Sequence, residues 1–198
     1  MKNTLFRPQA LLLALALLLA APALWSCSET ALQISLREHE QQLKNIDEDT
    51  IKHYLQRNNL QGTPTGSGLY YVNITNGQGT QVTSGRQVRV RYVGRFLSNG
   101  AHPASNGYPA SPGNFSYPVG SIFDNSADNR TTCGCAVFTA GSGAIAGFTE
   151  GLLLMRQGDR KLLLVPSRLA YGPTGQPGSI PIPSDAALSF DVEVLEVL

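Results

Sequence analysis

Three polar side chains occupy positions in the sequence where packing alone would favour apolar residues: Tyr92, Asp124 and Tyr171. Tyr92 belongs to an alternating, strand-like segment, Asp124 directly follows an aromatic residue, and Tyr171 precedes a glycine at a turn. Burying a polar group costs free energy unless it is hydrogen-bonded, so residues of this kind often mark functional sites. We therefore interpret these three residues as the polar groups of a binding or catalytic pocket.

Other kinds of chemistry lack their usual sequence signals. The chain has no glycine-rich phosphate-binding loop and no spaced set of metal ligands, so we expect neither a cofactor nor a metal. His39, His53 and His102 form no constellation, and we expect all three at the surface. Of the 15 Lys and Arg residues, two precede position 27, which leaves 13 against 14 Asp and Glu. This near-neutral balance argues against nucleic acid as a partner.

Residues 1–26 have the anatomy of a signal peptide. Two basic residues precede an apolar run at 11–21 that is too short for a comfortable bilayer span of about 20 residues. The sequence Leu-Trp-Ser-Cys at 24–27 resembles the lipobox of bacterial lipoproteins, which predicts cleavage before Cys27 and lipidation of its thiol. Removing Cys27 also leaves an even pair of cysteines. The alternatives are ordinary secretion, with cleavage near 21–23, and an uncleaved anchor helix.

A lipid on Cys27 with two or more acyl chains would hold the protein stably at a membrane. We therefore expect the bacterial cell envelope as its location, with the outer membrane favoured and the face of that membrane left open.

The other two cysteines stand two residues apart, at Cys133 and Cys135. A disulfide is the default state of cysteines in an exported protein. Residues two apart on an extended strand lie near the upper limit of about 7 Å between Cα atoms, so a bond needs a bend that Gly134 allows. We favour a local disulfide that pins the loop over free thiols or a redox role.

The segment 27–67 is polar and helix-prone up to Asn59, and its end is rich in Gly, Thr, Ser and Pro, as in a linker. Asp47 suits the N-cap of the second half of this helix. We interpret the segment as a lipid-anchored spacer, with a docking or dimerisation helix as the alternative. A broken apolar stripe at helical spacing comprises Leu43, Ile46, Ile51, Tyr54 and Leu55.

From Gly68 onward the sequence changes to short strands around one short helix. Gly147–Met155 has a helical apolar pattern, and many strands with one helix predict an α+β fold, a twisted antiparallel sheet packed on that helix. The expected strands are Leu69–Thr75, Val88–Val93, Lys161–Pro166 and Leu188–Val194. Arg89, Arg91 and Arg95 share one strand face, which we interpret as a solvated face in preference to a basic binding stripe.

A stretch at 101–121 is rich in Pro, Gly, Asn, Ser and Tyr and interrupts a hairpin. A structureless segment of this length inside a domain is unusual and points to a functional or mobile loop. Its aromatic residues Tyr108, Phe115 and Tyr117 are suited either to contact unfolded chains or to pack down on the domain.

The motifs from Gly68 to the last residue resemble those of FKBP-type peptidyl-prolyl cis-trans isomerases. Each motif alone is weak, but six in the family's order make a specific match. They are Val90–Gly94 (VRYVG), Phe123–Ser126 (FDNS), Ile145–Leu152 (IAGFTEGL), Leu169–Gly172 (LAYG), Ile180–Pro183 (IPIP) and Phe190–Leu195 (FDVEVL). The lipobox and the helical segment resemble the envelope-anchored bacterial members. The resemblance implies a domain at 68–198 with a half-barrel sheet wrapped on the short helix, and 101–121 as its insertion.

The resemblance also implies an aromatic pocket that binds proline-containing unfolded or peptide substrates. Asp124 is its acid, Phe148 its floor, and the Ile145 N–H and the Tyr171 hydroxyl are donors to substrate carbonyls. The walls implied are Tyr92, Phe123, Ile145, Tyr171, Ile182 and Phe190. The reaction twists an X–Pro amide over a barrier of about 18–20 kcal/mol and requires no nucleophile.

Two alanines depart from the family pattern. Ala136 stands where relatives often carry an aromatic, Ala140 replaces the usual Leu, and the turn at 141–144 is one residue shorter than in many relatives. These changes predict a wider or shallower pocket on that side. We therefore keep two alternatives to an enzyme that assists folding in the envelope: a low-turnover chaperone that uses the same pocket, and an assembly part docked through its helix.

Overall fold

The computed structural model describes residues 30–105, 107–129 and 131–198. The predicted signal peptide, lipobox and Cys27 lie outside the described residues. Residues 35–198 form one unit, and the contacts discussed below all belong to it. No helix in the described ranges combines the length and the apolar character needed to cross a membrane.

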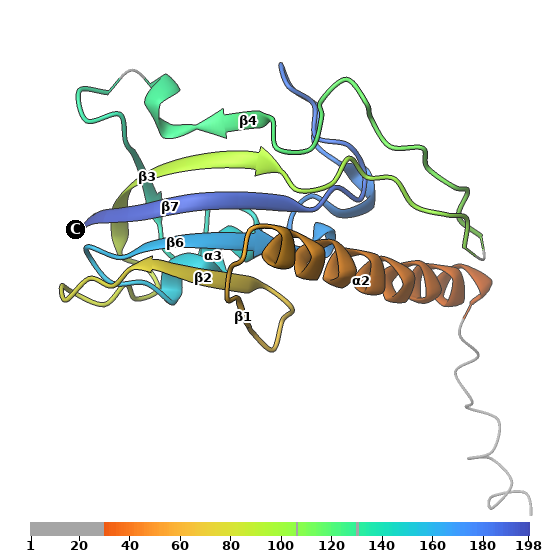
Figure 1. Ribbon diagram of the computed structural model, residues 1–198, viewed down its shortest axis with the longest axis horizontal. Coiled ribbons are helices and arrows are strands. Elements are labelled where there is room, and N and C mark those ends of the chain that lie inside the picture. Colours follow the sequence, from red (N-terminus) through yellow and green to blue (C-terminus); the bar gives the residue numbers. More distant parts are fainter. Residues whose placement is uncertain (1–29, 106, 130) are drawn as a thin grey trace, which may run out of the picture. The chain divides into compact units, whose positions relative to one another are not determined.

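A seven-stranded antiparallel sheet is the framework of this unit (Figure 1). Its order is β1-β2-β6-β7-β3-β4, and β5 pairs with β3 outside this path. The strands are β1 (Thr63–Pro64), β2 (Tyr70–Thr75), β3 (Gln87–Phe96), β4 (Ile122–Asn125), β5 (Ala136–Thr139), β6 (Arg160–Val165) and β7 (Leu188–Val197). Single-turn 3-10 helices lie at Ser126–Asn129, Ser167–Leu169 and Gly172–Thr174. The expected linker thus contains a strand, since Thr63 pairs with Tyr71.

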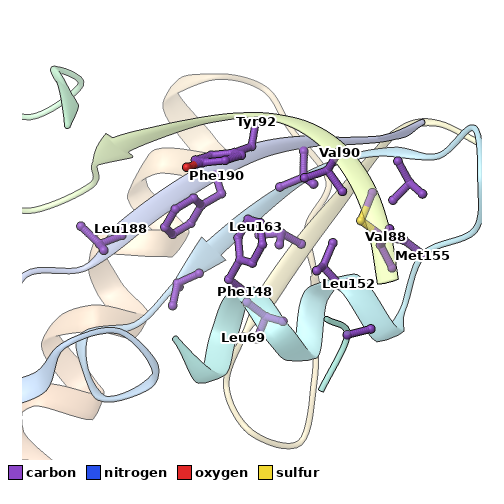
Figure 2. Close-up of a cluster of buried hydrophobic side chains, with 14 of the residues drawn as sticks. Leu69, Val88, Val90, Tyr92, Phe148, Leu152, Met155, Leu163, Leu188 and Phe190 are labelled. Carbon is purple, nitrogen blue, oxygen red and sulfur yellow. The ribbon is translucent and has the colours of Figure 1, made fainter. Parts of the chain in front are cut away.

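The predicted short helix is α3 (Ala146–Leu153), and it packs on one face of the sheet. Phe148 and Leu152 point from α3 toward the strands in Figure 2. β3 supplies the opposite wall because its residues alternate: Val88, Val90 and Tyr92 are buried on the same face. The predicted α+β class, with an antiparallel sheet on a short helix, is confirmed.

A longer helix, α2 (Ala31–Arg57), covers the other face of the sheet. Ile51 and Leu55 form a second apolar core with residues from β2, β6 and the segment before β7. Leu163 belongs to the α3 core and the next residue, Leu164, to the α2 core. Successive side chains of a strand point to opposite faces, so the two helices sandwich β6. The interpretation of this helix as a spacer is therefore wrong, because its buried residues run from Ser35 to Leu55.

Asp47 is also not an N-cap, because α2 runs through it without interruption. Its side chain is buried, and its Oδ2 accepts hydrogen bonds from the Ser167 N–H at 2.8 Å and the Ser167 hydroxyl at 2.7 Å. The carboxylate thus ties α2 to the turn after β6. Burial raises the pKa of Asp47 to about 6, although both Ser167 hydrogen bonds act in the opposite direction.

Asp47→Asn is expected to flatten the pH dependence of stability. With a pKa of 3.8 when unfolded and about 6 when folded, the native state holds the proton more tightly. Stability from this group is present at low pH and is lost as the pH rises from about 4 to about 6, by about 3 kcal/mol. An asparagine Oδ1 can accept both Ser167 bonds without a buried charge.

Urea unfolding at pH 4 and pH 8 measures this effect, with the exposed neighbour in Asp49→Asn as the control. Wild type and Asp49→Asn should lose stability between the two values, whereas Asp47→Asn should lose less. An equal loss in all three proteins contradicts the assignment.

The insertion at 101–121 is folded over much of its length. His102 bridges to Ser111 and Ser105 to Tyr108, which makes a narrow antiparallel loop. Tyr117 stacks on Phe96 of β3, with ring centroids 5.8 Å apart. In Figure 1 this green loop reaches α2, where Tyr108 stacks on a histidine of the helix.

Candidate functional site

A cavity of about 150 Å³ opens between the sheet and the first turn of α3. Four strands, two loops and α3 build it. Its lining residues are Tyr92, Phe123, Asp124, Phe138, Gly143, Ala144, Ile145, Phe148, Tyr171 and Phe190. Seven of the eight pocket residues predicted from the sequence therefore meet around one cavity.

Aromatic rings in mutual contact form its walls and floor. Phe148 of α3 lies 5.2 Å from Phe190 and 5.7 Å from Tyr92, ring centroid to ring centroid, and both contacts are edge-to-face. Phe123 meets Phe190 at 5.6 Å with perpendicular rings. Figure 2 shows Tyr92 and Phe190 on neighbouring strands facing Phe148 on the helix. Such arrangements hold rings in fixed positions and leave their faces to an apolar ligand.

Gly94 on β3 makes room for one of these walls. A Cβ atom at this position would lie 2.7 Å from Cζ of Phe123 and 3.1 Å from Cε1 of Phe190. The glycine of the VRYVG motif is thus required by the close approach of two rings to the strand backbone.

Asp124 brings a carboxylate to the rim of this apolar cavity. The Tyr92 hydroxyl donates a hydrogen bond of 2.7 Å to Asp124 Oδ2. Loss of hydration and this bond to the carboxylate both raise the pKa of Tyr92 well above its usual value. The phenol therefore stays protonated and orients the acid, which itself is exposed on its other side.

Tyr171 and Ile145 face the same cavity from two loops. Burial, and then the negative charge of Asp124, raise the pKa of Tyr171, so its hydroxyl remains a donor. Ile145 is the residue before α3, with an extended backbone. In the part of the chain that the structure describes, neither the Tyr171 hydroxyl nor the Ile145 N–H has a hydrogen-bond partner. Both are available to the carbonyl oxygens of a ligand.

Ile182 is the exception among the predicted residues. It is 7% exposed and belongs to the main core, but it does not line the cavity. The sequence analysis did not name Phe138 as a lining residue, and it related the turn that carries Gly143 and Ala144 only to the width of the pocket. Phe138 of β5 contacts Phe148 at 5.0 Å, and its place in a short alternating strand beside β3 was the available signal.

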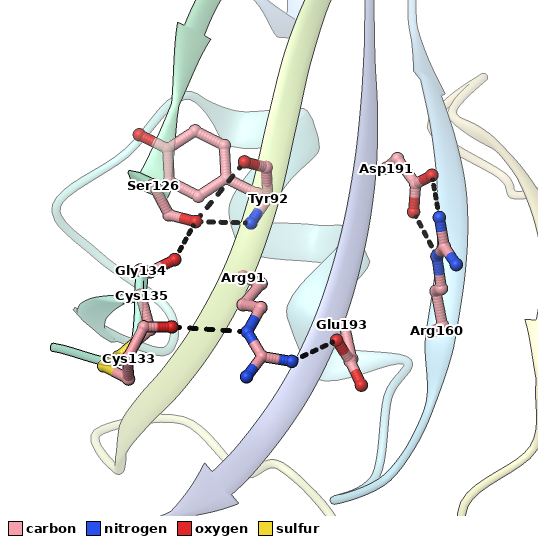
Figure 3. A network of polar contacts seen from close by, with 9 residues as sticks. All are labelled: Arg91, Tyr92, Ser126, Cys133, Gly134, Cys135, Arg160, Asp191 and Glu193. Carbon is pink, nitrogen blue, oxygen red and sulfur yellow. Dashed lines mark hydrogen bonds and ion pairs between the residues drawn. A yellow bond between two sulfur atoms is a disulfide. The ribbon is translucent and has the colours of Figure 1, made fainter. Parts of the chain in front are cut away.

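The backbone of Tyr92 is fixed from the outer edge of the sheet (Figure 3). Ser126 Oγ accepts a hydrogen bond from the Tyr92 N–H at 3.0 Å and donates one to the Gly134 carbonyl at 2.8 Å. Gly134 lies between Cys133 and Cys135, which the structure joins in a disulfide with Cα atoms 5.2 Å apart. The cystine loop is thus connected to a cavity wall through one serine.

Two of the three arginines of β3 are paired with acids on β7. Arg91 Nη1 lies 3.2 Å from Glu193 Oε2, and Arg89 pairs with Glu196. Arg95 donates to the Gly120 carbonyl at 2.9 Å. A bidentate pair joins Arg160 of β6 to Asp191 of β7 (Figure 3). The strand face is therefore a neutralised, solvated one, as the sequence indicated.

Two histidines are not at the surface, contrary to expectation. His39 is 2% exposed, the side chain of His102 is 6% exposed, and both contact Asp185. Only His53 is exposed. The residues that meet here are far apart in sequence, so no local spacing signals them.

A larger hollow of about 320 Å³ lies between α2 and the segment 64–70. It is lined by charged and small residues such as Lys44, Glu48 and Arg168, and it contains none of the predicted site residues. The aromatic cavity is the better candidate because it combines apolar walls with a few convergent polar groups.

The fold and the cavity together define a class of protein: an antiparallel sheet on a short helix, with a small aromatic cavity between them that has hydrogen-bond donors at its rim. Residues 78–195, more than half of the chain, match the family described as FKBP-type peptidyl-prolyl cis-trans isomerase. The chain therefore belongs to this family, which confirms the class of enzyme predicted from the motifs.

Individual relatives agree. A Trypanosoma cruzi protein named macrophage infectivity potentiator is 29% identical over 80% of this chain and 69% of its own length. The FKBP-type 22 kDa peptidyl-prolyl cis-trans isomerase of Escherichia coli K12 is 31% identical over 68% of this chain and 52% of its own. The crystal structure of FkpA from Escherichia coli shares the fold, with a TM-score of 0.57 at 24% identity. The structural alignment covers 98% of this chain and 75% of the FkpA chain.

In the sequence alignments the chain spans only part of such relatives: 28% of a Dictyostelium discoideum protein and 25% of FkpA.

Proposed function

We propose that this protein accelerates the cis–trans isomerisation of X–Pro bonds in exported polypeptides, and that a lipid on Cys27 holds it at a membrane of the bacterial cell envelope. One observation carries the first part. Aromatic walls, an apolar floor and the Tyr92–Asp124 pair meet around one small cavity in a chain of the isomerase family.

The cavity suits the chemistry of the twisted amide. Rotation about the X–Pro bond removes amide resonance, which lowers the dipole of the group. A dry aromatic environment therefore favours the twisted state over the planar one, relative to water. Phe148, Phe190 and Tyr92 would hold the prolyl ring while the peptide before it rotates. Each 1.4 kcal/mol of such differential stabilisation is a factor of about ten in rate.

The donors position the substrate chain. The Ile145 N–H and the Tyr171 hydroxyl lie at the cavity without partners in the described structure and would bond the carbonyls that flank the prolyl ring. Asp124 would act by electrostatics, because its carboxylate lies at the cavity in which the rotating carbonyl and the prolyl nitrogen of the substrate redistribute charge. No proton transfer to or from the substrate is needed.

Support for the second part of the proposal comes from the sequence. Basic residues, a short apolar run and Leu-Trp-Ser-Cys at 24–27 precede the helix. The disulfide between Cys133 and Cys135 also suits an oxidising compartment.

Metabolic labelling with a fatty acid tests the anchor in a bacterial host. Wild type should take up label and partition with membranes, and Cys27→Ala should do neither. Cys133→Ser is the matched control, since it removes a different cysteine and should leave labelling unchanged. Equal labelling of wild type and Cys27→Ala rejects the lipoprotein form without touching the isomerase assignment.

A holding function for unfolded chains is a second candidate, and exposed apolar residues beside the domain favour it. Phe115 is 76% and Val119 55% exposed on the insertion loop. Replacing both by Ser should weaken suppression of client aggregation while leaving turnover of short X–Pro peptides intact. A wild-type rate on such peptides no greater than in buffer would leave holding as the function of the cavity.

A further inference from the structure

Three potential metal ligands from distant parts of the chain meet outside the cavity. His39 comes from α2, His102 from the insertion loop, and Asp185 from the segment before β7. The Nε2 atom of His39 lies 3.2 Å from Asp185 Oδ2, and the Nε2 atom of His102 lies 3.3 Å from the same oxygen. The three ligand atoms all fall within 4.8 Å of one another. The side chains are 3%, 6% and 4% exposed.

The second ring nitrogen of each histidine has its own partner. Nδ1 of His102 lies 3.0 Å from the Pro103 carbonyl oxygen, and Nδ1 of His39 lies 3.3 Å from Ser105 Oγ. A carbonyl oxygen only accepts hydrogen bonds, so Nδ1 of His102 carries the proton. In the neutral ring, Nε2 then presents a lone pair to a carboxylate oxygen. Two acceptors at 3.3 Å require a cation between them, either a proton or a metal ion.

The hydrogen bonding of Asp185 indicates which of the two cations, a proton or a metal ion, fits this site better. Its Oδ1 is buried and has no hydrogen-bond partner among the described residues, although Oδ2 contacts both histidines. A buried carboxylate oxygen without a partner is costly. A proton on His102 would satisfy only the His102–Oδ2 contact. A metal ion bound beside the carboxylate would satisfy both oxygens.

The geometry also fits a transition metal. Four ligands at about 2.0–2.2 Å from Zn²⁺ place neighbouring ligand atoms about 3.3 Å apart, close to the two distances observed. Imidazole and carboxylate are ligands that Zn²⁺ accepts, and a hydrogen bond from the other ring nitrogen is the usual outer support of a zinc-bound histidine. Tyr108 further holds the His39 ring, stacked at 4.0 Å with planes 5° apart.

We propose that His39, His102 and Asp185 form a structural site for a divalent transition metal of the Zn²⁺ type. The metal would clip α2, the insertion loop and the segment before β7 together. Asp185 also connects this site to the cavity, because its N–H donates a 2.8 Å hydrogen bond to the carbonyl of Gly172, the residue after Tyr171. The site is separate from the proposed isomerase chemistry, in which the metal takes no part.

Zinc binding is measured on the full-length chain, purified without a histidine tag and carrying Cys27→Ala so that the only other cysteines are in the disulfide. After treatment with a chelator, wild type should bind one Zn²⁺ per chain. Its thermal midpoint should rise with zinc concentration, as expected for a ligand that binds the folded state, and should not respond to Mg²⁺. Binding of Co²⁺ should give the visible absorption of a low-symmetry, four- or five-coordinate site.

Three variants locate the site. His102→Gln and Asp185→Asn each remove one ligand and should weaken zinc binding by more than about 100-fold, the upper range for loss of an outer partner alone. Asparagine also tolerates the left-handed backbone of Asp185, where φ is 57°. Ser105→Ala leaves all three ligands in place and removes only the hydroxyl beside Nδ1 of His39. It should weaken zinc binding about tenfold.

His53→Gln is the matched control, because His53 is an exposed histidine on the same helix. It should bind zinc like wild type. The circular dichroism spectrum and X–Pro turnover of each apo variant show whether it is folded. Two results overturn the proposal: wild type that binds no zinc at micromolar concentration, or folded His102→Gln that binds it as tightly as wild type. The cluster would then be a hydrogen-bonded histidine–aspartate group only.

Discussion

Asp124→Val should lower kcat/KM for short X–Pro peptides by about 10- to 100-fold, because a hydrogen bond to a charged group contributes about 1.5–3 kcal/mol. Valine has nearly the shape of aspartate but leaves the Tyr92 hydroxyl, now 2.7 Å from Asp124 Oδ2, without its acceptor. It also removes the only carboxylate among the residues that line the cavity. The loss should appear for every residue X, since the cavity holds the proline.

The control for this variant is Asp128→Asn, an exposed acid in the turn that follows β4. It should keep wild-type turnover, which excludes a general effect of charge near the rim. Tyr92→Phe should be intermediate, because it removes the phenol but leaves the carboxylate in place. If Asp124→Val is folded and turns over peptides at the wild-type rate, the acid has no part in the reaction.

Leu163→Ala should destabilise the domain by about 2–5 kcal/mol, the usual range for truncation of a fully buried leucine. Leu163 is 0% exposed on β6 and lies under α3. The loss should appear as a lower urea midpoint with little change in the slope of the transition. The exposed Leu154 at the end of α3 is the matched control, and Leu154→Ala should cost much less.

A double variant tests the contact itself. A Cβ atom on Gly151 would lie 2.3 Å from Cδ1 of Leu163, so Gly151→Ala should cost about 1–3 kcal/mol despite the better helix propensity of alanine. In the Leu163→Ala background the added methyl group enters the space left by the leucine, and the same change should cost less or stabilise. Additive costs for the two variants would show that α3 does not pack on β6 at this point.

The sequence predicted well those features that depend on residues close together in the chain, such as strands and short motifs. Alternation in Val88–Val93 and in Leu188–Val194 placed the central strands, and the structure extends both by several residues. The order of the motifs predicted seven residues of the cavity, because each motif lies within a single strand, helix or turn. Ile182 differs since its apolar side chain suits a core as well as a pocket wall.

The predictions that were wrong concern contacts between segments that are far apart in the sequence. The apolar stripe of α2 predicted an amphipathic helix, but nothing in it specified that Ile51 and Leu55 would meet β6. Asp47 was predicted to be an N-cap because its actual partner, Ser167, is 120 residues away and leaves no signal near it in the sequence. The contact between His39 and Asp185 was not predicted for the same reason, because these residues are 146 positions apart and no local pattern indicates it.

The position of β7 has a consequence for how the chain acquires its structure. β7 follows every other strand in sequence, yet it lies between β6 and β3 in the sheet. Until Leu188–Val197 is in place, β1-β2-β6 and β3-β4-β5 remain two separate half-sheets, each with an unpaired edge. The sheet therefore stays open until the last of the described strands pairs with both neighbours, and the domain cannot reach its native state before that step. The two open edges are the places where the unfinished chain is most exposed to wrong strand pairing.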